Sequence, residues 1–186
     1  RVQDETISLN VPDGLTVHGI YESVDVNDPS TPSMVLGNLT GPTASTNDLV
    51  LGETVRGTSS GAKGIFIEQK TSTSAGFAYL NNVTFEKNEV VVFEQSGVTG
   101  NATDIDAGSP NITSRFTFDN GQRSTFYDYA RIHRRSTAQV PAKKLLVCFG
   151  ASDYDPADPG DFTTANSYIN HNFKTDIQTI NKVRNT

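Results

Sequence analysis

Residues 49–64 read LVLGETVRGTSSGAKG, and residues 85–100 read FEKNEVVVFEQSGVTG. A shift of 36 positions aligns their Ser-Gly pairs and final glycines, together with the pairs Leu49/Phe85, Glu53/Glu89 and Val55/Val91. Each segment has the pattern of a strand, a glycine turn and the start of a return strand. The sequence therefore predicts two β-hairpin units, related by a weak internal repeat, in one small barrel or sheet.

Alternating patterns extend this prediction on both sides of the repeat. Apolar and polar residues alternate over residues 6–11, and again over residues 15–21 after a Pro-Asp-Gly turn. Period two is typical of a half-buried strand. Further on, Phe116 and Phe118 alternate with polar residues before the turn signal Asn120-Gly121, and residues 143–149 form a short apolar run. No window has a sustained helical period, so we predict a mainly β fold with Gly-rich hairpins and few or no helices.

A polar, turn-rich stretch over residues 101–114 predicts a boundary. We expect β-rich modules carrying the repeat in residues 1–113. A second β-rich module, with the FDNGQR and KLLVCF segments, is expected in residues 114–186. The first residue is Arg1 and the last stretch is polar without a stop signal, so we expect a piece of a longer polypeptide.

Composition argues against several classes of function. The 186 residues carry a formal net charge of −6, which disfavours a nucleic-acid backbone as partner. Cys148 is the only cysteine, so no intrachain disulfide can form. No apolar run approaches the roughly 20 residues of a membrane span, and no signal-peptide pattern is present at the start.

Two motifs invite a catalytic interpretation. Gly57-Thr58-Ser59-Ser60-Gly61 matches G-x-S-x-G, but that motif activates serine only on a strand-to-helix elbow, and the flanks here predict strands. A hairpin turn that uses glycine for positive φ is the simpler interpretation. Cys148 lies in the apolar run and is expected to be a small buried hydrophobe rather than a nucleophile. We therefore predict that the chain is not an enzyme.

Two charged clusters are candidate binding sites. Asp153, Asp155, Asp158 and Asp161 are weak candidates for a hard cation such as Ca²⁺, although the EF-hand pattern fails and a solvated acidic loop is the simpler interpretation. Arg131, His133, Arg134 and Arg135 form a basic cluster that phosphates could contact. An interface or a solvent face of a strand is favoured for it. We predict no cofactor and no resident metal.

Residues 115–168 resemble a segment of large virion structural proteins from contractile-tailed bacteriophages, especially phages of marine cyanobacteria. The shared order is F-D-x-G-Q-R, an aromatic F-Y-D, a basic strand, an L-L-V-x-F strand, an acidic loop with G-D-F, and S-Y. The matching positions are Asp119, Gly121, Gln122, Arg123, Phe126, Tyr127, Asp128, Leu145, Leu146, Val147, Phe149, Gly160, Asp161, Phe162, Ser167 and Tyr168. Cys148 to Ala151 departs from the family, which often has an aromatic run there. Residues 52–64 resemble small β-modules of the same proteins more loosely.

This resemblance implies a structural component of a phage tail, in the baseplate or tail-fibre region, and hence a place in the virion. We expect it to act by protein–protein assembly with other tail or baseplate subunits, or with copies of itself. Aromatic and arginine residues commonly anchor interfaces, so Phe126, Tyr127, Tyr129 and Arg131 are the predicted contact residues. The alternative is a receptor- or carbohydrate-binding β-module of a tail fibre, which would contact a host surface receptor.

Overall fold

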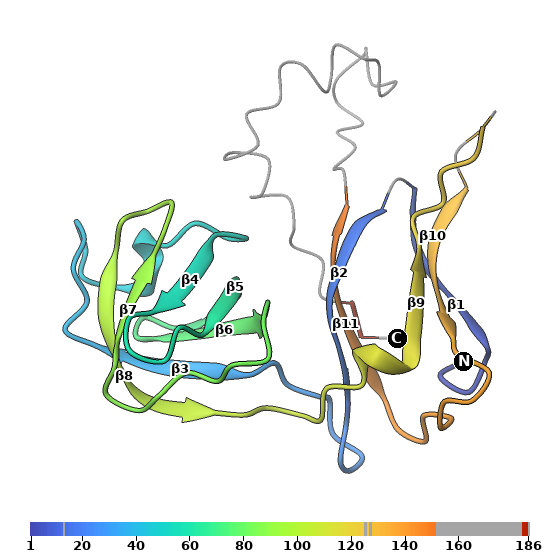
Figure 1. Ribbon diagram of the computed structural model, residues 1–186, viewed down its shortest axis with the longest axis horizontal. Helices are drawn as coiled ribbons and strands as arrows, with labels where there is room; N and C mark the ends of the chain where they lie inside the picture. Colours follow the sequence, from blue (N-terminus) through green and yellow to red (C-terminus); the bar gives the residue numbers. More distant parts are fainter. Residues whose placement is uncertain (13, 125, 127, 152–183, 186) are drawn as a thin grey trace.

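The protein is built almost entirely from antiparallel strands (Figure 1). The structure, a computed structural model, describes residues 1–12, 14–124, 126, 128–151 and 184–185. Strands take up 48% of the described residues and helical residues 4%, and none of the helices among them has seven residues or more. The predicted mainly β fold is therefore confirmed. In chain order the elements are β1 (Thr6–Pro12), β2 (Gly14–Glu22), β3 (Ser33–Gly37), η1 (Thr46–Asp48), β4 (Thr54–Gly57), β5 (Lys63–Thr71), β6 (Ser74–Tyr79), β7 (Val90–Phe93), β8 (Thr99–Asp106), η2 (Thr113–Arg115), β9 (Phe116–Asp119), β10 (Tyr129–Arg134), β11 (Leu145–Ala151) and β12 (Arg184–Asn185).

Two three-stranded sheets form a sandwich from the two ends of the chain. One sheet has the order β1-β10-β9 and the other the order β12-β11-β2. Both contribute to a common core of the buried residues Ile7, Leu9, Ile20, Ile112, Phe116, Ala130, Ile132, Leu145, Val147 and Phe149. Because β1 pairs with β10 and β2 pairs with β11, strands from both sides of the predicted 113/114 boundary belong to the same unit.

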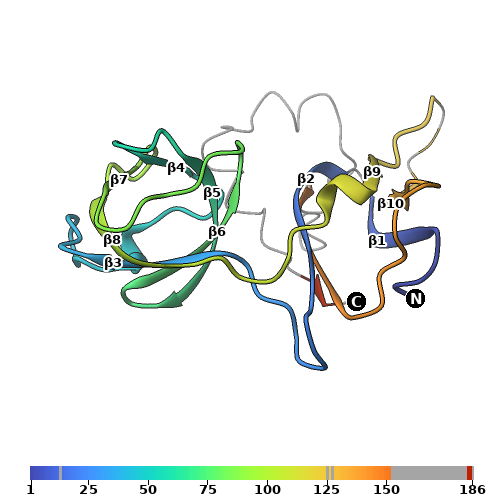
Figure 2. The ribbon, with the colours of Figure 1, turned by 60° about the horizontal axis from the view of Figure 1, so that its bottom comes forward.

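A closed six-stranded barrel is inserted between β2 and β9 (Figure 2). Its strand order is β3-β6-β5-β4-β7-β8, and β8 closes the ring by pairing with β3. The two predicted repeat units supply corresponding strands: β4 corresponds to β7, and β5 to β8. The third strand of each half differs in origin, since β6 follows β5 directly whereas β3 precedes both repeats in the chain. The barrel therefore has a pseudo-twofold arrangement of two three-stranded halves, β4-β5-β6 and β7-β8-β3. The third strand of the second half, β3, comes from an earlier part of the chain.

The two glutamates of the repeat lock these halves together. Glu53 is 2% exposed and Glu89 5% exposed. Each carboxylate crosses to the glycine turn of the opposite unit. Glu53 Oε2 accepts hydrogen bonds from the amides of Gln95 and Ser96, at 3.0 and 2.8 Å, and from the Ser96 hydroxyl at 3.1 Å.

The second carboxylate makes the corresponding contacts. Glu89 Oε2 accepts from the amides of Ser59 and Ser60 at 3.2 and 3.1 Å, and its Oε1 accepts from the Ser60 hydroxyl at 2.9 Å. Each glutamate also accepts a hydrogen bond from the backbone amide three residues before it. The Val50 amide donates to Glu53, and the Glu86 amide donates to Glu89. Buried carboxylates are tolerated because several donors replace their hydration.

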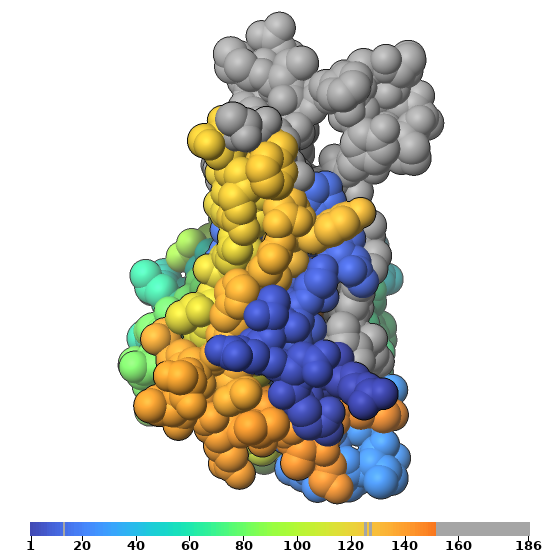
Figure 3. Space-filling model, turned by 90° about the vertical axis from the view of Figure 1, so that its right-hand side faces the viewer, coloured from blue at the N-terminus to red at the C-terminus, as the bar shows by residue number. Residues whose placement is uncertain are grey.

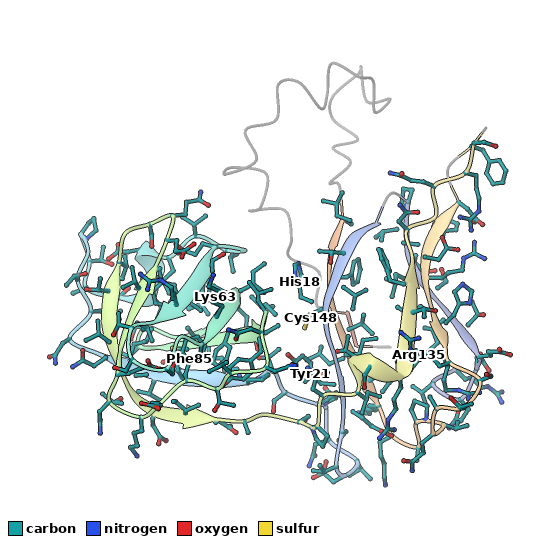
Figure 4. All side chains as sticks on the ribbon, in the orientation of Figure 1. His18, Tyr21, Lys63, Phe85, Arg135 and Cys148 are labelled. Atoms are coloured by element: carbon teal, nitrogen blue, oxygen red, sulfur yellow. The ribbon has the colours of Figure 1, made fainter. Side chains whose placement is uncertain are left out.

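The barrel and the sandwich share a small apolar junction. Ile65, Ile67 and Ala78 on the barrel pack with Tyr21, Leu146 and Cys148 on the sandwich. Figure 4 shows Tyr21 and Cys148 on the side of the sandwich sheet that faces the barrel. Burial in this junction raises the pKa of the Tyr21 hydroxyl and that of the Cys148 thiol, the latter to about 12. Cys148 is thus a packing residue that stays protonated at neutral pH.

The first prediction concerns the exchanged carboxylates. Replacing Glu89 with Gln should lower the free energy of unfolding by about 2–4 kcal/mol, because an amide leaves buried N–H donors facing its own NH₂ group. The measurement is urea denaturation followed by far-UV circular dichroism. Glu94→Gln is the matched control, because the Glu94 side chain is 51% exposed and should cost less than about 0.5 kcal/mol. Equal effects of the two substitutions would contradict the assignment.

Acid should weaken the barrel for the same reason. Burial raises the pKa of Glu89, but hydrogen bonds from Glu86, Ser60 and Ser59 outweigh it and hold the pKa below the ordinary 4.5. The folded state therefore favours the carboxylate, so this stabilisation is complete above the ordinary value and is lost as pH falls through the folded pKa. We expect the unfolding temperature to drop between about pH 5 and about pH 2, and to drop less in Glu89→Gln. If the unfolding temperature of Glu89→Gln falls with pH as steeply as that of the parent chain, protonation of Glu89 does not destabilise the fold.

Candidate interaction site

The connection between β9 and β10 begins in the segment Phe118-Asp119-Asn120-Gly121-Gln122-Arg123. Asp119 ends β9, and its carboxylate holds the start of the connection. Arg123 donates Nη2–H to Asp119 Oδ2 at 2.7 Å and Nη1–H to Oδ1 at 3.0 Å, while the Gly121 amide donates to Oδ1 at 3.0 Å. Such a bidentate arginine–carboxylate pair fixes direction as well as distance.

The far side of the connection is tied into the same charge network. Arg131 on β10 donates to Asp128 and lies 3.9 Å from Asp119 Oδ2. His133 Nε2 lies 3.8 Å from that oxygen. The hydrogen bond from Arg123, then that from the Gly121 amide, holds the pKa of Asp119 far below its usual range, so the network keeps its charge at neutral pH.

Gly121 makes the tight turn possible. Its φ of +81° lies in the left-handed region, and a Cβ there would come within 2.1 Å of the Asp128 carbonyl oxygen. The Asp128 amide donates to the Gly121 carbonyl at 2.7 Å, and the Arg123 amide donates to Phe126 O at 3.0 Å. We call residues 119–131 the clamped hairpin, because backbone and side-chain bonds both span it.

The clamped hairpin exposes aromatic rings. Phe126 is 59% exposed and Tyr129 56% exposed, although both belong to residue types that are usually at least partly buried. The Arg131 side chain is 27% exposed. Figure 3, which faces the sandwich end of the molecule, shows the hairpin rising beyond the N-terminal strand. Of the four predicted contact residues, the structure thus brings Phe126, Tyr129 and Arg131 to one hairpin, and Tyr127 lies outside the described residues.

The serines of the G-x-S-x-G match serve the barrel. They form the turn between β4 and β5, strand–turn–strand as the flanks predict, with Gly61 at φ +72°. The Ser60 hydroxyl donates to Glu89, a carboxylate that also binds both serine amides. This geometry caps a turn.

The basic cluster is largely engaged within the fold. Arg131 binds Asp128, Arg134 donates to the Ala138 carbonyl at 3.2 Å, and Arg135 donates to the Ser114 carbonyl at 3.0 Å. These contacts hold the end of β10 and the segment that follows it. They leave fewer donors for phosphates than the sequence alone suggests.

The acidic candidates Asp153, Asp155, Asp158 and Asp161 lie outside the described residues. Within the part of the chain that the structure describes, no group of three or more His, Cys, Asp or Glu side chains is placed to hold a metal ion. The described helices are all too short and too polar to cross a membrane.

A groove of about 510 Å³ lies on the barrel between η1 and β5, lined by Thr46, Asn47, Leu49, Leu51, Phe66, Ile67, Glu68 and Gln69. Phe66, its only ring, is 2% exposed and belongs to the barrel core. The groove therefore offers no aromatic platform for stacking a ligand.

Comparisons with protein-family models, with curated proteins and with solved structures find no match. The sequence predicts Phe126 and Tyr129 as contact residues but does not predict that Asp119 and Arg123 hold the hairpin. Their spacing of four residues around Asn120-Gly121 was the available signal, because an acid and a base flanking a tight turn can face each other.

The third prediction tests the clamp. Gly121→Ala should open the hairpin, because the added Cβ would collide with backbone at a position that already requires positive φ. Hydrogen exchange at the Asp128 amide should accelerate by about tenfold or more, as expected for a local loss of about 1.4 kcal/mol.

Gly97→Ala provides the control for this substitution. Gly97 has a similar φ of +73° but no atom within 4 Å of an added Cβ, and it lies in the barrel. It should strain its own turn and leave exchange at Asp128 unchanged. If Gly121→Ala also leaves that exchange unchanged, the clamp does not hold the hairpin.

Proposed function

We propose that this chain is a structural component of a bacteriophage tail, in the baseplate or tail-fibre region, and that it acts by protein–protein assembly. The observation that carries the proposal is the clamped hairpin. Residues of the motif shared with virion proteins build it: Asp119, Gly121 and Arg123 hold the turn, and Phe126 stands exposed on it. Four residues of the resemblance thus build a hairpin that holds an aromatic ring in solvent.

The physical argument concerns the cost of this surface. Burying a phenylalanine side chain is worth about 1.5–3 kcal/mol relative to leaving it in water. The sandwich forgoes that gain at Phe126 and at Tyr129, while fixing the hairpin with charged hydrogen bonds. A partner that covers the rings recovers the gain, and the hydrogen bonds that already hold Asp119, Arg123 and Asp128 reduce the conformational entropy that binding costs. Aromatic and arginine residues are the usual centres of such contacts.

We propose further that the chain is not an enzyme. The three residues with nucleophilic potential that the sequence raises take part in the fold, through the Ser59 backbone amide, the Ser60 amide and hydroxyl, and the packed Cys148 side chain. Ser59 and Ser60 form a turn bound to Glu89, and Cys148 is 2% exposed in the apolar junction. Burial keeps its thiol protonated, which is the unreactive form.

Receptor or carbohydrate binding at a tail fibre is the second candidate. The exposed rings of Phe126 and Tyr129 are the observation in its favour, because sugars and receptor loops also pack on aromatic faces. The two rings stand on a protruding hairpin, whereas small-ligand sites are usually concave. Assembly is therefore the better supported proposal.

Hydroxyl-radical footprinting tests the assembly proposal. Phe126 and Tyr129 should be readily oxidised in the isolated chain and protected at least about fivefold in purified phage particles whose genome encodes the sequence, since buried rings lose contact with the radical-bearing solvent. Leu80 on the barrel, 49% exposed, serves as an internal reference.

Two results would overturn assembly through the hairpin. The first is the absence of the chain from purified particles, as judged by mass spectrometry of their proteins. Alternatively, it is present while Phe126 and Tyr129 are oxidised as fast as in the isolated chain. The second result would favour receptor binding, which leaves the rings free until the host is met.

A further inference from the structure

The tight turn of the clamped hairpin contains Asn120-Gly121, the only Asn-Gly pair in the sequence. Asparagine before glycine is prone to spontaneous deamidation, because glycine has no side chain to hinder the approach of its amide nitrogen to the asparagine side chain. In that reaction the deprotonated Gly121 nitrogen forms a bond to Asn120 Cγ, and the side-chain nitrogen leaves as ammonia. Water then opens the resulting succinimide ring to aspartate or isoaspartate. The turn thus contains a reactive pair that needs water alone as co-reactant.

The fold holds the attacking nitrogen away from this reaction. The Gly121 N–H donates to Asp119 Oδ1 at 3.0 Å. Asp119 stays charged at neutral pH, because the hydrogen bond from Arg123 holds its pKa far below the usual range. A carboxylate in contact with the N–H disfavours a second negative charge on the nitrogen, so the amide is harder to deprotonate. The two bonds from Arg123 also fix the direction in which the carboxylate points.

The rest of the turn is fixed as well. The Gln122 amide donates to Asn120 Oδ1 at 3.0 Å, and the Gly14 amide donates to the Asn120 carbonyl at 3.2 Å. Ring closure replaces the Gly121 N–H by a bond to carbon, so the hydrogen bond to Asp119 must be lost. The ring also imposes its own torsion angles on the asparagine, which the two bonds to Asn120 oppose. The reaction therefore requires that the hairpin first opens.

The main product does not fit the hairpin. Isoaspartate carries the main chain through the former side chain, so the backbone gains one methylene group, and a negative charge appears next to Asp119. Two backbone bonds across the hairpin depend on the original length, from the Asp128 amide to the Gly121 carbonyl at 2.7 Å and from the Arg123 amide to the Phe126 carbonyl at 3.0 Å. A longer and more negative turn disfavours both bonds. The modified hairpin therefore does not close as before.

We propose that Asn120 is a site of spontaneous deamidation that the clamped hairpin protects, and that modification during an opening of the hairpin leaves it permanently open. The clamp then has a chemical role besides its geometric one, since it preserves the turn for as long as it stays closed. The protecting contacts all lie within the chain, so this inference does not depend on the proposed assembly. Any partner that binds only the closed hairpin would slow the reaction further.

The test compares the folded and unfolded states of the parent chain. The chain is incubated at mildly alkaline pH, with and without guanidinium chloride, and deamidation at Asn120 is followed by peptide mass spectrometry. The rate should be at least about tenfold lower in the folded state, because only the open hairpin reacts. Hydrogen-exchange protection of the Gly121 amide reports the same opening and should agree with this ratio within an order of magnitude.

Two variants locate the protection. Asp119→Ala removes the acceptor of the Gly121 N–H, and its ratio of unfolded to folded rates should be at least about threefold smaller than that of the parent chain. Asp104→Ala is the control, because Asp104 also pairs with a cation, Lys87 at 3.0 Å, but lies on β8 in the barrel. It should keep the ratio of the parent. Far-UV circular dichroism checks that both variants fold.

Equal rates in the folded and unfolded parent would sink the proposal, and this comparison needs no variant. Equal ratios for Asp119→Ala and Asp104→Ala would show that Asp119 does not protect the turn.

The modified chain tests the second part of the proposal. After separation by ion exchange, the isoaspartate form should exchange the Asp128 amide at least about tenfold faster than the parent chain. Asn120→Asp adds the same charge on a backbone of normal length and should accelerate that exchange less. Unchanged exchange in the isoaspartate form would show that the hairpin closes again. Equal acceleration in Asn120→Asp would show that the longer backbone is not the cause.

Discussion

The exchange of two buried carboxylates is the interaction on which the barrel depends. Glu53 and Glu89 each leave their own repeat and accept donors from the turn of the other. In each turn two backbone amides and a serine hydroxyl donate to the opposite unit, so neither half of the barrel is complete alone. A buried carboxylate that is hydrogen-bonded on both oxygens is highly directional, and removing one partner exposes several unpaired groups at once. This reciprocity ties the two halves of the barrel to each other in one register.

Much of this barrel could be predicted from the repeat, since aligned Glu, Ser-Gly and Gly positions are local features of the sequence. The closure of the ring could not. Strand β3 precedes the repeats and takes the place that β6 has in the other half. No pattern in residues 33–37 predicts that this strand pairs with β8. The sequence also does not predict the exchange. The repeat aligns Glu53 with Glu89, but it does not show whether each carboxylate binds the turn of its own unit or that of the other. Long-range pairings of this kind are decided by packing rather than by local preference.

The sandwich illustrates the same division. Alternation in residues 6–11 and the apolar run before Phe149 predict strands, whereas the polar stretch over residues 101–114 suggested a boundary between modules. In the fold that stretch ends β8 and returns the chain to β2, where Tyr21 bridges to Asn111. In the candidate interface, the sequence predicts Phe126 and Tyr129 as contact residues because aromatic side chains commonly anchor interfaces. Their exposure, and the clamp formed by Asp119 and Arg123, depend on β9 and β10 being neighbours.

The entry and exit of the barrel run side by side. Ser33 pairs with Asp106, and just outside the barrel the backbone amide of each of Ser30 and Ser109 donates to the other residue, one to a hydroxyl and one to a carbonyl, both at 2.9 Å. For the sandwich, the whole barrel is therefore equivalent to a short loop that leaves and returns at one point. A segment attached in this way can be gained, lost or exchanged for another in a single genetic event without disturbing the strands on either side. The barrel is thus an attachment that the sandwich could carry or lack without a change in its own strand pairing.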